Sequence, residues 1–104
     1  MTDRFELALA DTTRPRRDIS RDRRDRTLEL LRFAAIGAGD VIVDFLPFRG
    51  YFTHLFSSIV GKDGQVYAAI PDRLTAIERI ANGKMEIAAS LADRKNITLI
   101  TGAA

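Results

Sequence analysis

The residues best placed to do chemistry lie in one short stretch, VIVDFLPFRGYFTHLF, at positions 41–56. An apolar run ends in Asp44, a turn containing Pro47 and Gly50 follows, and an amphipathic segment then begins. Open α/β sheets bind their ligands beyond the carboxyl ends of the strands, where a turn of this kind lies. The stretch is therefore a ligand-binding turn, the remains of one, or an ordinary connection between a strand and a helix.

Composition narrows the chemistry that this turn could serve. The 104 residues are enough for one small domain, and they include no cysteine and one histidine, His54, so thiolate and histidine-rich metal sites are excluded. The net charge of +2 is too small to imply a nucleic-acid or membrane partner. The start of the chain lacks the long apolar core of a signal peptide, and no stretch approaches the roughly 18 apolar residues of a membrane span. We therefore expect a cytoplasmic protein with no metal, no nucleic acid and no membrane partner.

Hydrophobic periodicity predicts the elements around the turn. The consecutive β-branched residues at 41–43 are typical of a strand buried on both faces of a parallel sheet. An amphipathic helix, a glycine turn and a second apolar run follow, which predicts a βαβ unit. The expected strands are 41–46, 65–70 and 97–101, and the expected helices are 15–34, 51–60 and 71–93. Asn82 and Gly83 should break or kink the last helix. The fold class is α/β, with three parallel strands and helices on both faces.

The most biased segment is DTTRPRRDISRDRRDR, residues 11–26. Asp18 and Arg21, and Asp22 and Arg26, stand at helical spacing with the acid first, the favourable orientation for ion pairs on a helix. An RNA-binding arginine tract would carry a larger charge excess and interleaved aromatic residues. The segment is therefore interpreted as a solvated helix with weak surface ion pairs. His54 falls opposite the apolar stripe of its own helix, so we expect it to be exposed.

The turn and its surroundings resemble the class I S-adenosylmethionine-dependent methyltransferases, in particular a branch whose first motif is similar to D-[FL]-x-P-G-G-G-Y-F-T. The matching residues are Asp44, Phe45, Leu46, Pro47, Phe48, Arg49, Gly50, Tyr51, Phe52 and Thr53. The resemblance extends to VGKDGQVYAAIP, to the leading RP..D..RD...R pattern, and to NITLITGAA at the end of the chain. It therefore covers nearly all of the 104 residues.

The resemblance implies S-adenosylmethionine as cofactor and a set of residues that would bind it. These residues are Asp44, Leu46, Phe48, Gly50, Tyr51, Ile70 and Asp72. Asp44 would orient the amino end of the cofactor through the loop, and Gly50 would give access to the backbone. No residue is identified as a catalytic base, so methyl transfer would depend on positioning.

Several positions depart from the family pattern. Phe48 and Arg49 stand where the family has glycines, whose lack of a side chain lets the cofactor approach the main chain. Ile70 holds the place of the acid that binds the ribose hydroxyls, with Asp72 two residues further on, and Ala103 holds the place of an acid near the adenine. We therefore expect weakened cofactor binding.

A complete sheet of this family has seven strands in the order 3-2-1-4-5-7-6, and the chain supplies 3-2-1. We expect residues 1–36 to form a helical extension, and residues 37–104 to form the N-terminal half of a Rossmann-like cofactor-binding domain. The chain is then either part of a longer methyltransferase or a truncated descendant. A truncated descendant would expose the first strand as an apolar edge that a homodimer could cover. The alternative function is a non-catalytic dimerisation or interaction module.

Overall fold

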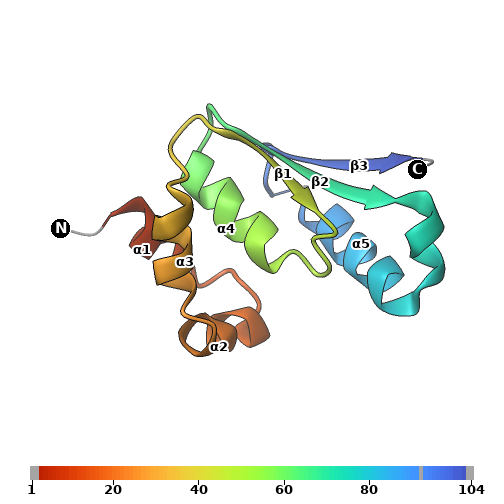
Figure 1. Cartoon of the computed structure of the whole chain (residues 1–104), viewed down its shortest axis with the longest axis horizontal. Helices are drawn as coiled ribbons and strands as arrows, with labels where there is room; N and C mark the ends of the chain where they lie inside the picture. The colour runs from red at the N-terminus through yellow and green to blue at the C-terminus, as the bar shows by residue number, and fades with distance from the viewer. Residues whose placement is uncertain (1–2, 92, 103–104) are drawn as a thin grey trace.

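The computed structural model describes residues 3–91 and 93–102, and its helices and strands alternate after a helical start (Figure 1). The elements are α1 (Arg4–Leu9), α2 (Arg16–Arg24), α3 (Thr27–Ala34), β1 (Val41–Phe45), α4 (Tyr51–Val60), β2 (Gln65–Pro71), the 3-10 helix η1 (Asp72–Ala76), α5 (Glu78–Ser90) and β3 (Ile97–Gly102). No helix of the described residues is long and apolar enough to cross a membrane.

The sheet confirms the predicted α/β class. Its strands run in the order β1-β2-β3, and both neighbouring pairs are parallel. Asp44 of β1 pairs with Ala68 of β2, which in turn pairs with Leu99 of β3. The order is the predicted 3-2-1 read from the other edge, so β2 is the central strand of the described sheet.

One face of the sheet carries the larger core. Val66, Ala68 and Ile70 of β2 are at most 1% exposed. They pack with Val60 of α4, with Ile80 and Ile87 of α5, and with Ile97 of β3. The alternation of buried and half-buried residues along β2 follows directly from the period-2 geometry of a strand with one covered face.

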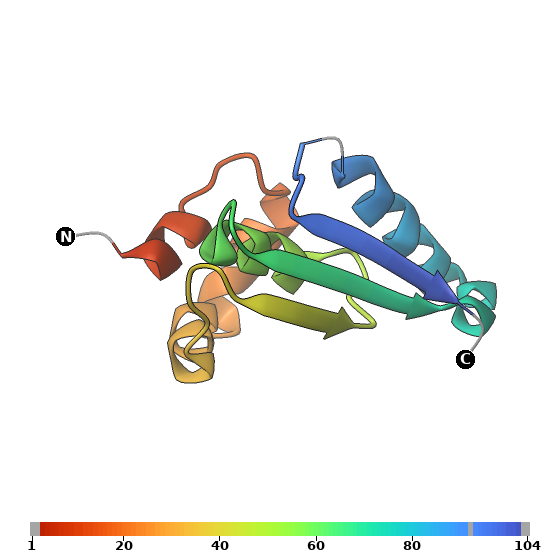
Figure 2. The ribbon, with the colours of Figure 1, turned by 90° about the horizontal axis from the view of Figure 1, so that it is seen from above.

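The other face of the sheet is bare among the described residues, and Figure 2 shows it with no helix in front of it. Val41, Val43 and Phe45 are 67%, 64% and 62% exposed. The prediction of helices on both faces is therefore wrong for this part of the chain. Both crossovers step in the same direction across the sheet, and right-handed crossovers that do so place their helices on the same side.

The N-terminal segment folds as separate helices and not as the single predicted helix 15–34. Arg26 adopts a left-handed conformation with φ 53°, and this turn separates α2 from α3. Ala8 of α1 and Leu31 of α3 pack against Leu55 and Ile59 of α4 in a second core. The side of α4 facing away from the sheet is thus covered as well. The division of the chain at residue 36 remains a prediction.

Candidate functional site

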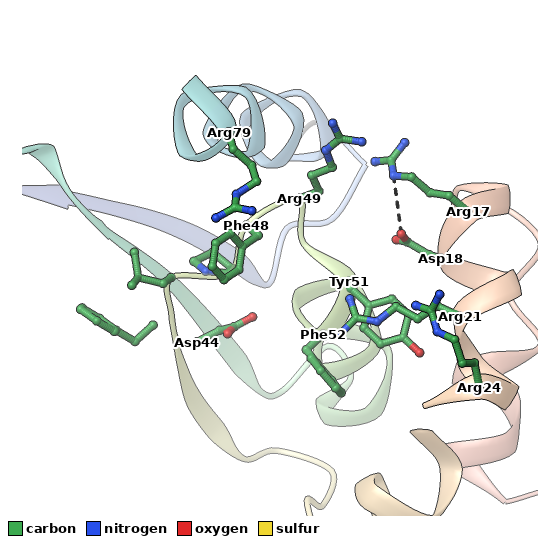
Figure 3. Close-up of a pocket in the computed structure, with 13 residues that line it drawn as sticks. Arg17, Asp18, Arg21, Arg24, Asp44, Phe48, Arg49, Tyr51, Phe52 and Arg79 are labelled. Atoms are coloured by element: carbon green, nitrogen blue, oxygen red, sulfur yellow. Dashed lines mark ion pairs between the residues drawn. The ribbon is translucent and has the colours of Figure 1, made fainter. Parts of the chain in front are cut away.

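A cavity of about 810 Å³ lies at the carboxyl end of β1, where the predicted ligand-binding turn is found (Figure 3). Its walls come from α2, from the end of β1 and the loop after it, from the first turn of α4, and from α5. The lining residues are Arg17, Asp18, Arg21, Arg24, Asp44, Phe45, Leu46, Pro47, Phe48, Arg49, Tyr51, Phe52 and Arg79. The volume lies within the range of natural small-molecule sites, roughly 300–1,000 Å³.

The loop between β1 and α4 has left-handed backbone at three alternate residues. Leu46, Phe48 and Gly50 have φ angles of 56°, 55° and 90°. Such a conformation costs a residue other than glycine about 1–2 kcal/mol. The backbone at Phe48 therefore favours glycine. Arg49 does not have a positive φ, so its backbone conformation does not favour glycine.

Helix α5 packs against this loop at Gly83. A Cβ added to Gly83 would lie 2.0 Å from the carbonyl oxygen of Phe48. Helix α5 runs through Asn82 and Gly83, so the predicted break at these residues is wrong. The predicted helix 71–93 is interrupted instead at Ile77, whose extended backbone separates η1 from α5. Gly83 is there because the loop backbone presses against the helix, a close approach that only glycine permits.

Asp44 points to the covered side of the sheet, in register with Ala68. The hydroxyl of Thr53 in α4 donates a 2.7 Å hydrogen bond to its Oδ2 atom. Burial raises the pKa of Asp44 above its usual value, against the effect of this hydrogen bond. The carboxylate is thus held at the base of the cavity and can accept a hydrogen bond from a ligand.

Tyr51 lines the cavity, but its hydroxyl lies in a buried network with the N-terminal segment. The hydroxyl donates to Oδ1 of Asp22 at 2.7 Å and lies 2.5 Å from Oγ1 of Thr27. Burial raises the pKa of Tyr51 to about 12. Arg14 forms a two-pronged ion pair with Asp22, at 2.7 and 2.8 Å, and the guanidinium of Arg21 stacks 4.0 Å from the centre of the Tyr51 ring. Tyr51 therefore fixes α2 as a wall of the cavity.

The remaining predicted cofactor residues lie elsewhere. Gly50 is buried at the start of α4, and a Cβ there would lie 3.2 Å from Ile87. Ile70 is in the core beneath the sheet, and Asp72 is exposed at the start of η1; neither lines the cavity. Ala103 lies outside the described residues. The structure thus gathers Asp44, Leu46, Phe48 and Tyr51 at one cavity.

The prediction that the charged N-terminal segment is a solvated helix with surface ion pairs is wrong in part. Arg14 and Asp18 are only 4% and 5% exposed, so this helix is not simply solvated. The predicted pairs within the segment do not form; Arg14 binds Asp22 and Arg21 binds Asp25. Burial opposes the ionisation of Asp22, but hydrogen bonds from Arg14 and Tyr51 hold its pKa below the usual value.

The sequence does contain a pattern that could have indicated the contribution of α2 to the cavity wall. Arg17, Arg21 and Arg24 stand at i, i+4 and i+7, which places them on one face of α2. That face lines the cavity. The pattern could have been recognised as a stripe, but nothing in the sequence says against which surface α2 packs.

His54 is half-buried and not exposed as predicted. Its helix is covered on the outer side by the N-terminal segment, and Arg94 donates to its backbone carbonyl at 3.3 Å. Burial, and then the charge of Arg94, lower the pKa of His54, which keeps the ring neutral near pH 7. The ring lines a second, smaller cavity of about 390 Å³ with Arg17, Arg49 and Glu86 among its neighbours.

No protein-family model matches the chain, and no curated protein matches its sequence. Among solved structures, the chain is similar to fibrillarin from Aeropyrum pernix, crystallised with natively bound S-adenosyl-L-methionine. The similarity has 25% sequence identity and a TM-score of 0.49, and it covers 65% of this chain. The chain spans only 26% of the length of that structure. A likeness of this size identifies neither the family nor the function of the chain.

Proposed function

We propose that the chain is the cofactor-binding half of an S-adenosylmethionine-dependent methyltransferase scaffold. The observation that carries this proposal is the cavity at the carboxyl end of β1, with Asp44 at its base and a loop of left-handed residues at its side. Parallel α/β sheets bind nucleotide-like cofactors at this position. The motif that starts at Asp44, read from the sequence, supports the same assignment.

The cavity fits such a cofactor in size and in part of its chemistry. Asp44 would accept a hydrogen bond from the amino end of the cofactor, and the loop around Phe48 and Gly50 would lie along it. The side chain of Phe48, 46% exposed and lining the cavity, takes up space that a glycine would leave open. The cofactor supplies an electrophilic methyl group when it is bound, and the chain contributes positioning and exclusion of water.

Calorimetric titration of S-adenosylmethionine into the full chain tests this function. We expect weak binding by the wild type and stronger binding by Phe48→Gly, because this change removes both the ring and the left-handed strain. Arg49→Gly is the matched control, since Arg49 does not have positive φ, and it should bind no better than the wild type. If neither the wild type nor a folded Phe48→Gly variant binds at millimolar concentration, the proposed function is wrong.

The second candidate is an interaction module that forms a homodimer through β1. β1 pairs with β2 on one side only, and Val41, Val43 and Phe45 point from it to the bare face. The bare face carries Val41, Val43, Phe45, Gln65, Tyr67, Ala69, Thr98 and Ile100. None of these side chains is charged, so β1 of a second copy could pair edge to edge with β1 around a two-fold axis without repulsion between like charges. Strand β3 would lie outside that contact.

Light scattering over a dilution series tests the homodimer. We expect the wild type to reach the mass of a dimer at high concentration and Val43→Lys to stay a monomer, because it places a charge on β1. Thr98→Lys puts the same charge on the same face, but on the far strand, and should leave the mass unchanged. A wild type that stays monomeric at about 0.1 millimolar, where a dimer with a dissociation constant of about 1 micromolar would be almost fully formed, would rule the homodimer out.

A further inference from the structure

Five arginines surround the cavity, and they come from three parts of the chain. Arg17, Arg21 and Arg24 line it from α2, Arg49 from the loop, and Arg79 from α5. Figure 3 shows the α2 arginines on one side of the cavity and Arg49 and Arg79 on another, with the ring of Phe48 next to Arg79. Guanidinium groups that converge on a cavity from different elements form the usual geometry for binding a phosphate.

The carboxylates among these arginines do not balance them. Arg17 pairs with Asp18 and with Glu86, and it shares Glu86 with Arg49. Arg21 and Arg24 share one partner, Asp25. In the part of the chain that the structure describes, Arg79 has no carboxylate within ion-pair distance. Asp18 and Asp44 also line the cavity, so two carboxylates stand there against five guanidinium groups. The cavity is therefore electropositive.

The start of α4 and the aromatic rings add two further features. The first turn of this ten-residue helix has backbone N–H groups without acceptors inside the helix, and Tyr51 and Phe52 of that turn line the cavity. Phe48 presents a partly exposed ring, with the guanidinium of Arg79 at 5.7 Å from its centre. An aromatic ligand could stack on Phe48 while its anionic group reaches the arginines.

We infer that the cavity binds a ligand with a phosphate group and an aromatic ring, of the nucleoside monophosphate class. Arg24, Arg49 and Arg79 hold the phosphate, and Phe48 holds the ring. Within the proposed function this ligand is the methyl acceptor, and only that assignment rests on the proposed function. The binding of the phosphate rests on the arginines alone.

Calorimetry on the full chain with adenosine monophosphate, adenosine and inorganic phosphate as separate probes tests the inference. We expect the monophosphate to bind more tightly than inorganic phosphate, adenosine to bind weakest, and the affinity to fall as salt is added. Removing two guanidiniums with Arg24→Gln/Arg79→Gln should lower the affinity for the monophosphate by roughly tenfold or more. Equal binding of adenosine and the monophosphate by the wild type would overturn the phosphate site.

The matched control is Arg23→Gln/Arg73→Gln, which removes the same charge from α2 and η1 at exposed residues that do not line the cavity. It should change the affinity by no more than about twofold, as expected for a screened charge outside the site. An equal loss in both double variants would overturn the inference, because the effect would then be one of net charge. The single variant Arg79→Gln repeats the test if the double variant unfolds. If the wild type binds the monophosphate while neither the wild type nor a folded Phe48→Gly variant binds S-adenosylmethionine, the proposed function is refuted and the phosphate site stands.

Discussion

The two faces of the sheet differ in how well the described residues cover them. On the covered face, Val66, Ala68 and Ile70 lie under α4 and α5, and the N-terminal helices add a further layer behind α4. On the bare face, Val41, Val43 and Phe45 are mostly exposed. Strand β1 is apolar on the bare side and carries its one acid, Asp44, on the covered side. The strand whose sequence looks buried on both faces therefore has no fully buried residue in the structure.

The exposure of one face of β1 shows how a run of β-branched residues should be interpreted. The residues at 41–43 indicate that both faces of the strand require cover. They do not indicate that the described residues supply both covers. The candidate site lies where it does because the helices that build its walls are on the covered side, whereas no described helix lies over the bare face.

Substitution of Gly83 by alanine should disturb the covered side most. Its Cβ would lie 2.0 Å from the Phe48 carbonyl oxygen and 2.4 Å from the carbon, and backbone atoms cannot move aside as a side chain can. We expect the free energy of unfolding to fall by about 3 kcal/mol, although alanine is the better helix former. Urea denaturation followed by circular dichroism measures this. Gly37→Ala, whose Cβ would meet Asp40 at an ordinary 3.7 Å, is the control and should stay within about 0.5 kcal/mol of the wild type. Wild-type stability of Gly83→Ala would show that loop and helix are further apart.

A matched pair of valines compares the two faces directly. Val66→Ala removes two methyl groups from the covered face and should lower the free energy of unfolding by about 2–3 kcal/mol. Val43→Ala makes the same change on the bare face and should cost less than about 0.5 kcal/mol. Denaturation at a concentration where the chain is monomeric gives both values. Equal losses would contradict the claim that this face is uncovered, because Val43 would then be buried in solution.

The fold followed from the sequence where local pattern and topology agree. All three strands were predicted to within one residue at each end, since apolar runs and glycine turns specify them locally. The cover of the sheet was not predicted, because it depends on which direction each crossover takes. The break at Arg26 was missed as well, since arginine gives no sign of a left-handed conformation.

The candidate site was predicted at the loop and missed at its walls. Asp44, Phe48 and their neighbours follow from a turn after a strand. Arg24 and Arg79 come from helices far apart in sequence, and their meeting depends on how α2 and α5 pack. Gly83 was misread because a glycine that permits close approach and a glycine that ends a helix look alike in sequence.

Two tyrosines test how firmly the N-terminal layer is attached to the covered side. Tyr51→Phe removes a hydroxyl that Asp22 and Thr27 both contact, and it leaves these groups buried with one partner fewer. We expect a loss of about 1–2 kcal/mol in the free energy of unfolding, measured by denaturation. Tyr67→Phe on the bare face is the control and should lose less than about 0.5 kcal/mol. If both variants match the wild type, the buried network does not hold α2 in place.

The smallest effect should come from Asp44, the one inward-facing acid of β1. Burial raises its pKa in the folded chain above the usual 3.8 of an exposed aspartate, so the folded state favours the protonated form. The stability that this provides is full below pH 3.8 and is lost as the pH rises through the folded pKa. Asp44→Asn cannot ionise, and its amide oxygen can still accept from Thr53. The variant should therefore be slightly more stable than the wild type at pH 7.

The pH dependence of that gain separates burial of the charge from other effects of the substitution. Both proteins lose stability in acid as Asp22, whose pKa is lowered in the folded chain, becomes protonated, so the difference between them isolates Asp44. We expect the gain to shrink as the pH falls from 7 and to vanish below pH 3.8, where Asp44 is neutral in both states. Urea denaturation at a series of pH values measures it, with Asp63→Asn at an exposed turn as the control for loss of a charge alone. A gain that persists unchanged into acid would mean that the amide stabilises the site by a new hydrogen bond, and that the carboxylate of Asp44 is solvated well enough to remain charged at no cost.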